Sequence, residues 1–174
     1  ERSSAASDVY KRQLKDSLRV NAYGNVDELN ASIGVVTLYA TPDLKRKLKS
    51  IQNDLFDLGA DLCVPISENN NGRLRVSTSQ IETLEAEIDE MNNILKPLNS
   101  FILPGGCKSA TFLHLARTIC RRAERSVVSL KSKEEINENT LIYLNRLSDW
   151  LFVASRVENQ ENSTEVLWSP GKNK

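Results

Sequence analysis

The sequence has little of what disulfide frameworks, metal centres and membrane spans require. Its three cysteines, Cys63, Cys107 and Cys120, are an odd number without a CxxC spacing, which favours a reduced intracellular protein over a disulfide scaffold or a zinc site. The single histidine, His114, gives no basis for a histidine-based metal site or a catalytic triad. No apolar run approaches the roughly 18 residues of a membrane span, so we expect no membrane partner.

Charge of one sign is not in excess either. The 23 Lys and Arg residues are balanced by 23 Asp and Glu residues, so the formal net charge is zero. A balanced chain is not expected to bind nucleic acid or a membrane surface through a general basic field, and any basic site must be local. The 174 residues, 40% of them hydrophobic, suffice for one globular domain with a buried core.

The first residues differ in character from the rest. Residues 3–13 read SSAASDVYKRQ, which looks like the translation of a sequencing adapter, so residues 1–13 are set apart from the fold. The alternative is a natural polar arm. We therefore expect the folded domain at residues 14–162, followed by an irregular tail at 163–174.

Helical periodicity predicts five helices, and almost nothing has the alternation of a β-strand. The helices are expected at about residues 17–40, 42–62, 79–95, 106–131 and 138–159. Thr41 before Pro42 is typical of a helix N-cap, and Ser79 with Glu82 has the spacing of a capping box. Short loops between long helices predict an all-α bundle of antiparallel neighbours.

The helix expected at 106–131 carries arginines beside apolar surface. Arg117, Arg121 and Arg125 follow one another at intervals of four, so they stack along one side, where like charges repel. Guanidinium groups bind phosphate oxygens through paired hydrogen bonds, so this row predicts a polyphosphate site. Ion pairs to other helices, or a solvated charged face, explain the spacing equally well.

Polar residues on two other helices also have two interpretations. Asp27 and Glu28 could be counter-ions to the arginines or a surface pair. Asn145, next to Arg146 and one turn before Asp149, could bind an adenine or a ribose, or be a buried structural amide. Spacing alone leaves both questions open.

Three features near residue 105 favour structural roles when taken singly. Pro104-Gly105-Gly106 precedes a helix, where a glycine-rich turn can cradle phosphate, but it lacks the P-loop pattern and favours a tight turn. Phe101 alone favours the core, and His114 alone favours a structural histidine.

Taken together, four ordered motifs carry a family resemblance. They are GNVDELNASIG at 24–34, FILPGG at 101–106, HLARTICRRAER at 114–125 and YLNRLSD at 143–149. In these motifs the sequence resembles the PduO-type ATP:cob(I)alamin adenosyltransferases. Lys15-Asp16 match that family's KDD element, and the likeness covers residues 14–160 in consistent order.

The resemblance implies a ferritin-like five-helix bundle that assembles as a homotrimer with active sites between subunits. It implies transfer of the 5′-deoxyadenosyl group of ATP to the cobalt of cob(I)alamin, with Mg²⁺, giving adenosylcobalamin and tripolyphosphate. Because reduced cobalt is the nucleophile, the protein contributes orientation and charge stabilisation. The resemblance also suggests a cobalamin reductase and an adenosylcobalamin-dependent enzyme as partners, in a bacterial cytoplasm or, in a eukaryote, the mitochondrial matrix.

The family's site residues carry over position by position. The residues expected to bind ATP are Lys15, Arg121, Arg122, Ala123, Glu124, Arg125 and Asn145. Among these, Arg121 is the expected main phosphate ligand and Glu124 the candidate Mg²⁺ ligand. Asp27 and Arg117 match a salt-bridged pair across the subunit interface, and Phe101 matches the aromatic ring that crowds the lower face of the corrin; these three are the expected catalytic residues.

One departure from the family's pattern bears on activity. The family has a Gly- and Thr-rich ATP loop, TxTGDxGxT, upstream of the KDD element, and residues 1–13 stand in its place, so we expect impaired activity of this chain. Two alternatives to the enzyme stay open: a non-catalytic ATP- or cobalamin-binding bundle that acts as a sensor or carrier, and a purely structural oligomer. Phe101 and Asn145 argue against the structural oligomer, which would not need both beside the arginines.

Overall fold

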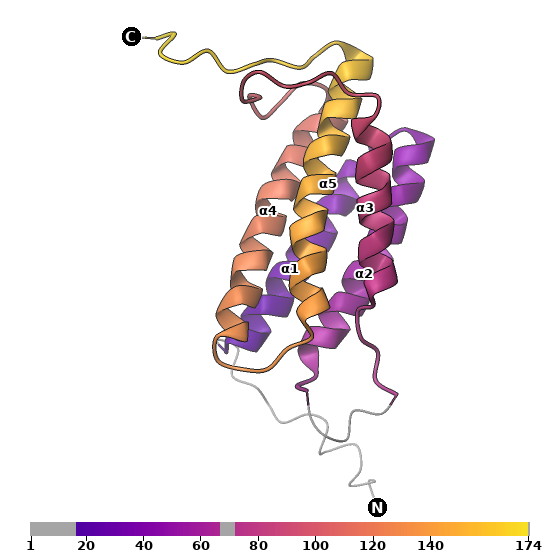
Figure 1. Ribbon diagram of the computed structural model, residues 1–174, viewed down its shortest axis with the longest axis vertical. Coiled ribbons are helices and arrows are strands. Elements are labelled where there is room, and N and C mark those ends of the chain that lie inside the picture. Colours follow the sequence, from indigo (N-terminus) through magenta and orange to yellow (C-terminus); the bar gives the residue numbers. More distant parts are fainter. Residues whose placement is uncertain (1–16, 67–71, 174) are drawn as a thin grey trace, which may run out of the picture.

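The computed structural model describes residues 17–66 and 72–173, which form five helices and no β-strand (Figure 1). The helices are α1 (Leu18–Val36), α2 (Pro42–Cys63), α3 (Thr78–Asn92), α4 (Lys108–Lys131) and α5 (Glu138–Asn162). The predicted all-α five-helix bundle is confirmed. Of the helices in the described ranges, none is both long and apolar enough to cross a membrane.

Local sequence signals explain where α1 and α2 begin. The side chain of Ser17 accepts a hydrogen bond from the backbone N–H of Val20, which caps α1. Thr41 accepts from the N–H of Leu44 and Pro42 follows it, so the predicted start of α2 is confirmed.

The predicted cap of α3, Ser79, was wrong by two residues, and α3 begins at Thr78. The N-cap is Ser77, whose backbone N–H donates to Oε1 of Gln80 at 2.9 Å, so the reciprocal contact uses Gln80 and not Glu82. α1 also ends at Val36 and not near residue 40, because Thr37 begins a turn and its hydroxyl donates to the carbonyl oxygen of Gly34.

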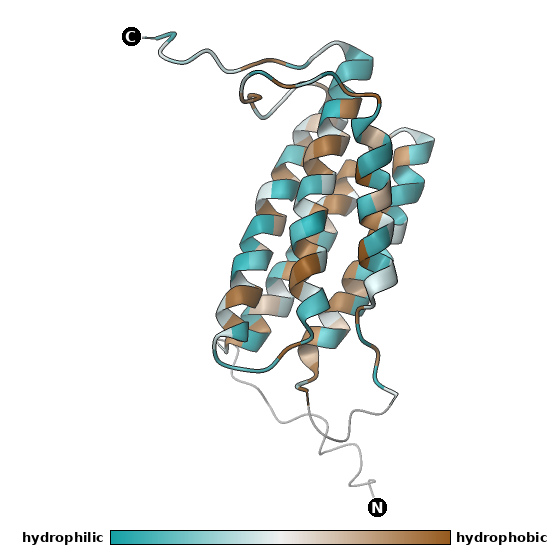
Figure 2. Cartoon of the chain, in the orientation of Figure 1, coloured by the Kyte–Doolittle hydropathy of each residue, from teal (hydrophilic) through white to brown (hydrophobic). Residues whose placement is uncertain are grey.

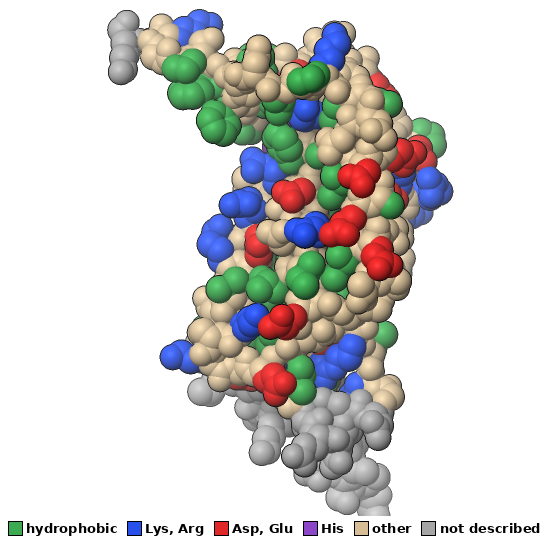
Figure 3. Space-filling view, viewed as in Figure 1, with side chains coloured by type: hydrophobic (Ala, Val, Ile, Leu, Met, Phe, Trp, Pro, Cys, Tyr) green, Lys and Arg blue, Asp and Glu red, His purple; other side chains and the backbone are tan. Residues whose placement is uncertain are grey.

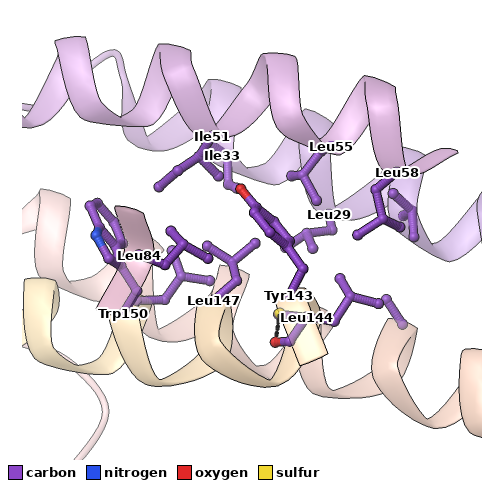
Figure 4. Packing of buried hydrophobic residues seen from close by; sticks show 14 of the residues in the cluster. Leu29, Ile33, Ile51, Leu55, Leu58, Leu84, Tyr143, Leu144, Leu147 and Trp150 are labelled. Atoms are coloured by element: carbon purple, nitrogen blue, oxygen red, sulfur yellow. Dashed lines mark hydrogen bonds between the residues drawn. The ribbon is translucent and has the colours of Figure 1, made fainter. Parts of the chain in front are cut away.

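The helices pack around one core, with α4 against both α1 and α5, α2 against α1, and α3 against α5 (Figure 1). Brown apolar residues concentrate between the helices and teal polar residues on their outer sides (Figure 2). Tyr143 and Trp150 of α5 are the largest fully buried side chains (Figure 4). Their polar atoms are satisfied at the edge of the core: Tyr143 donates to Asp54 at 2.9 Å, and Trp150 donates to Glu87 at 2.7 Å.

A buried carboxylate joins three parts of the chain at the opposite end from the C-terminus. Asp61 of α2 accepts from the backbone N–H of Val76 at 2.8 Å, from Arg75 at 2.6 Å and from Asn137, the N-cap of α5, at 2.7 Å. Three charge-assisted contacts compensate the desolvation of this carboxylate. Asp61 thereby fixes the start of α5 relative to α2.

Candidate functional site

A tight turn places Phe101 beside the start of α4. Gly106 has φ = 107°, a conformation that favours glycine, and an added Cβ would lie 2.0 Å from Oδ1 of Asn159. The Asn159 amide holds this turn by accepting from the N–H of Cys107 at 3.0 Å and donating to the carbonyl oxygen of Gly105 at 2.9 Å. The prediction of a tight turn in place of a phosphate cradle agrees with these contacts, and they explain why α4 begins at Lys108 and not at Gly106.

The C-terminal segment also supports Phe101. Residues 101–103 pair with residues 166–168 through an isolated bridge between Ile102 and Leu167, and the N–H of Trp168 donates to the carbonyl oxygen of Phe101 at 2.7 Å. The two segments lie across the same end of the bundle (Figure 1). The ring of Phe101 is nevertheless 77% exposed. The structure thus presents an aromatic ring at the surface on a restrained backbone, and not in the core.

An apolar cleft, which we call the aromatic cleft, opens beside that ring. It is lined by Leu98, Ser100, Phe101, Ile102, His114, Arg117 and Phe152, and its volume is about 510 Å³. His114 packs edge-on against Phe152, with ring centroids 6.3 Å apart. Burial and the nearby Arg117 lower the pKa of His114, so its ring is neutral at pH 7. The cleft therefore combines aromatic walls with two nitrogen-bearing side chains.

A second, polar cleft lies near the other end of α4, between α4 and the start of α1. Arg122, Arg125, Ser126 and Ser129 line it together with Leu18 and Asn21. Arg122 forms an ion pair with Glu28 of α1, and Asn25 donates to Ser126 at 2.7 Å, so α1 and α4 are tied together here. Of the two interpretations of Glu28, the counter-ion is the one observed.

Two other arginines of α4 have no carboxylate partner among the described residues to balance their charge. Arg121 and Arg125 are exposed, and neither forms an ion pair with a carboxylate of the described residues. Positively charged side chains gather along the edge of the molecule where α4 runs (Figure 3). Ala123, in contrast, is fully buried in the core, so its side chain does not reach this surface. Two arginines are thus free to bind an anion.

A chain of hydrogen bonds orients Asn145. Its Nδ2 donates to Oε1 of Glu124 at 3.0 Å, and its Oδ1 accepts from Arg146 at 2.7 Å. Arg146 is itself held by Glu85 of α3, with Nε 2.7 Å from Oε1. Asn145 is therefore a half-buried amide with a fixed orientation, beside a carboxylate on the arginine helix.

The cysteines and the candidate metal ligands of the described residues are scattered. All three cysteines are free, and burial raises the pKa of the Cys120 thiol, which donates to the carbonyl oxygen of Leu144. No group of three or more histidine, cysteine, aspartate or glutamate side chains in residues 17–66 and 72–173 is arranged to hold a metal ion. Glu124 stays the predicted Mg²⁺ residue, because such ions are commonly bound through one or two carboxylates together with phosphate oxygens.

For two predicted site residues, Lys15 and Asp27, the described residues of one chain show no contact with the site. Lys15 lies outside the described residues. Asp27 is exposed and forms no ion pair with Arg117 in the described chain, where Arg117 leaves its buried Nε without a hydrogen-bond partner. A salt bridge between them thus stays a prediction about neighbouring subunits.

Comparison with known proteins assigns the chain to a family. A family model described as cobalamin adenosyltransferase matches residues 4–158. A corrinoid adenosyltransferase of Bacillus subtilis is 49% identical over 153 residues, covering 85% of this chain and 78% of the relative. One from Mycobacterium leprae is 44% identical over 170 residues, covering 93% and 88%. The chain belongs to the cobalamin adenosyltransferase family.

Solved structures extend the likeness to three dimensions. A phenylalanine-to-alanine variant of a PduO-type ATP:corrinoid adenosyltransferase from Lactobacillus reuteri, complexed with cobalamin and ATP, has a TM-score of 0.84 and 38% identity, covering 90% of this chain and 88% of that one. An arginine-to-lysine variant complexed with ATP also has a TM-score of 0.84 at 38% identity, covering 90% of each chain. The predicted PduO-type family is confirmed.

Two residues of the site were not assigned to it from sequence. Phe152 lies seven positions after Asn145, so helical spacing places both on nearly the same side of α5 and was a usable signal. His114 was assigned a structural role, and no spacing signal shows that its ring lines the aromatic cleft.

Proposed function

We propose that this chain transfers the 5′-deoxyadenosyl group of ATP to cob(I)alamin. The electron pair of Co(I) forms a bond to C5′ of the nucleotide, the bond from C5′ to the triphosphate oxygen breaks, and tripolyphosphate leaves with the electron pair of that broken C–O bond. The observation that carries the proposal is that α4 carries unpaired arginines and, through His114 and Arg117, also lines the cleft beside the exposed ring of Phe101, in a chain of this family.

The arginines act on the leaving group. Arg121 and Arg125 have no carboxylate partner among the described residues, so their charge is available to the triphosphate. As C5′–O breaks, negative charge accumulates on the tripolyphosphate, and fixed guanidinium groups stabilise that charge without reorganising. Arg122 contributes from the polar cleft, with its position set by Glu28.

Glu124 and Asn145 act on the nucleotide side. Asn145 has its amide oxygen held by Arg146 and one N–H engaged by Glu124, which leaves its other N–H to donate to an acceptor on the adenosine. Glu124 would hold Mg²⁺ through its carboxylate, and the ion would neutralise phosphate charge there. This fixed geometry orients C5′. An enzyme that supplies no nucleophile of its own gains rate from such orientation.

The corrin side requires the aromatic ring and a second subunit. Phe101 projects from a restrained backbone, so its ring excludes water from the lower face of the corrin. The chain assembles as a homotrimer in which Asp27 of one copy pairs with Arg117 of the next. Support for this pairing is that Asp27 is exposed and that Arg117, whose guanidinium has further donors besides Nε, forms no ion pair with a carboxylate of the described residues.

The activity is tested with ATP and chemically reduced cobalamin under anaerobic conditions, by following the light-sensitive product. The assay compares the chain with residues 1–13 unchanged and a version that carries the family's Gly- and Thr-rich loop in their place. We expect product from the second and less from the first. If neither forms product although both ligands bind, the chain is a binding protein and the enzyme proposal fails.

Phosphate binding is tested with Arg121→Ala. We expect weaker ATP binding by about ten- to a hundredfold, the usual range for a lost hydrogen bond to a charged group, with unchanged helicity. Lys133→Ala is the matched control, because it removes one exposed positive charge beyond the end of α4. Equal weakening in both variants would mean that only net charge matters.

A further inference from the structure

His114 is a buried polar side chain whose hydrogen bonds are not made by the described chain. Only 3% of its surface is exposed, and neither ring nitrogen has a hydrogen-bond partner among the described residues. Nε of Arg117, one turn further along α4, is buried and lacks a partner in the same way. Both side chains line the aromatic cleft, together with the rings of Phe101 and Phe152.

This arrangement is costly unless the cleft is filled. Buried polar atoms in folded proteins are almost always hydrogen-bonded, and leaving one unpaired loses the hydration of that atom without replacement. The cleft lining offers no substitute, because Phe101, Phe152 and Leu98 present only carbon atoms from their side chains. The hydroxyl of Ser100 donates to the carbonyl oxygen of Trp168 instead. The missing partner is therefore a polar group that enters the cleft from outside the described chain.

The chemistry of the two side chains defines that group. A neutral imidazole offers one N–H donor and one acceptor nitrogen, and the guanidinium of Arg117 offers donors only. A carboxylate offers acceptors only, so it has no donor for the acceptor nitrogen of His114. A carboxamide offers both kinds of group: its oxygen accepts from Arg117 and its NH₂ donates to that nitrogen. The rim of a cobalamin corrin ring carries carboxamide side chains on an otherwise apolar macrocycle.

We propose that His114, with Arg117, binds a peripheral carboxamide of the corrin and so makes the enzyme selective for amidated corrinoids. The inference rests on the proposed function for the identity of the ligand. His114 is then a specificity-determining residue: it touches the substrate's rim, while Phe101 meets the face of the ring. Selectivity arises because an ester or acid at that position leaves a buried donor or acceptor unpaired.

The test compares two corrinoids in equilibrium binding to the full chain with ATP present. One is cobinamide, with its carboxamides, and the other has the same ring with methyl esters in their place. We expect the unsubstituted chain to prefer cobinamide, and His114→Phe to lower that preference about tenfold, the usual effect of one unpaired buried group. His114→Gln, which keeps a donor and an acceptor, should retain most of the preference.

Each further outcome is decisive. An unchanged preference in His114→Phe overturns the inference, as does an equal loss of affinity for both corrinoids. If His114→Phe does not fold, His114→Leu is measured against the same two ligands. A change in oligomeric mass with an intact preference means that a second copy supplies the missing partner, and the inference fails. Selective binding without adenosyl transfer would count against the proposed function only.

Discussion

Gly106 is the position where one methyl group should disturb both the fold and the site. Gly106→Ala places a Cβ 2.0 Å from Oδ1 of Asn159, at a residue whose φ of 107° side chains rarely adopt. The amide of Asn159 cannot stay in place. Its Oδ1 would lose the hydrogen bonds from Cys107 N–H and from the hydroxyl of Thr164.

The size of the effect follows from these contacts. The backbone conformation costs about 1–3 kcal/mol for a residue with a side chain, and two lost hydrogen bonds cost about 1 kcal/mol each. We therefore expect the free energy of unfolding to fall by about 3–5 kcal/mol. Because the same turn carries Phe101, corrinoid affinity should fall as well, while ATP affinity changes little.

Urea denaturation followed by circular dichroism measures the first effect. Gly59→Ala is the matched control: Gly59 lies within α2, an added Cβ meets no atom within 4 Å, and we expect a gain of about 0.5–1 kcal/mol. A loss below about 1 kcal/mol for Gly106→Ala would refute the view that this turn is rigid and fixes Phe101.

Three further predictions concern other parts of the molecule. Asp61→Ala should lower the free energy of unfolding by about 3–5 kcal/mol, because it leaves buried partners unpaired, whereas Asp43→Ala, at an exposed pair, should change the same urea transition little. Glu85→Gln, which releases Arg146 and with it the amide of Asn145, should raise the KM for ATP by up to about fivefold, and the exposed Glu82→Gln should not. The pKa of His114 is lowered by burial and by Arg117, so below its ordinary value of 6.5 the unfolded chain binds a proton that the folded chain does not. The contribution of His114 to the free energy of unfolding should be complete above pH 6.5 and should fall as the pH drops below it. Because His114 is the chain's only histidine, the urea midpoint of His114→Phe should change less between pH 7 and 5.5 than that of the unsubstituted chain. An equal change of the midpoint with pH in both proteins would contradict the assignment.

The helices could be predicted because their signals are local. Thr41 with Pro42 marks the start of α2 by chemistry within one turn, and apolar spacing identifies the buried side of α4. The start of α3 was misplaced because two serines, Ser77 and Ser79, both precede the apolar run. In the structure Ser77 is the cap, its backbone N–H donates to Gln80, and Asp61 of α2 accepts from the N–H of the preceding residue, Val76. The contact with Asp61 comes from another helix and leaves no local sequence signal.

The site could be predicted only in part, for the same reason. The spacing of the arginines and the position of Asn145 are visible in one helix at a time. The partners that define their roles come from other helices: Glu28 of α1 for Arg122, and Glu85 of α3 for Arg146. His114 could not be assigned, because an unpaired ring nitrogen is a property of packing and leaves no trace in residue spacing.

The four arginines of α4 therefore differ in role, and the surroundings of each side chain decide which role it has. Arg122 is neutralised within the chain by Glu28, so it fixes α1 against α4. Arg117 lines the aromatic cleft, and its buried Nε has no hydrogen-bond partner among the described residues. Arg121 and Arg125 are exposed without a carboxylate among the described residues, and they repel each other at a spacing of four. An anion that bound both would relieve that repulsion, and this is the physical reason why we propose Arg121 and Arg125 as ligands of the triphosphate.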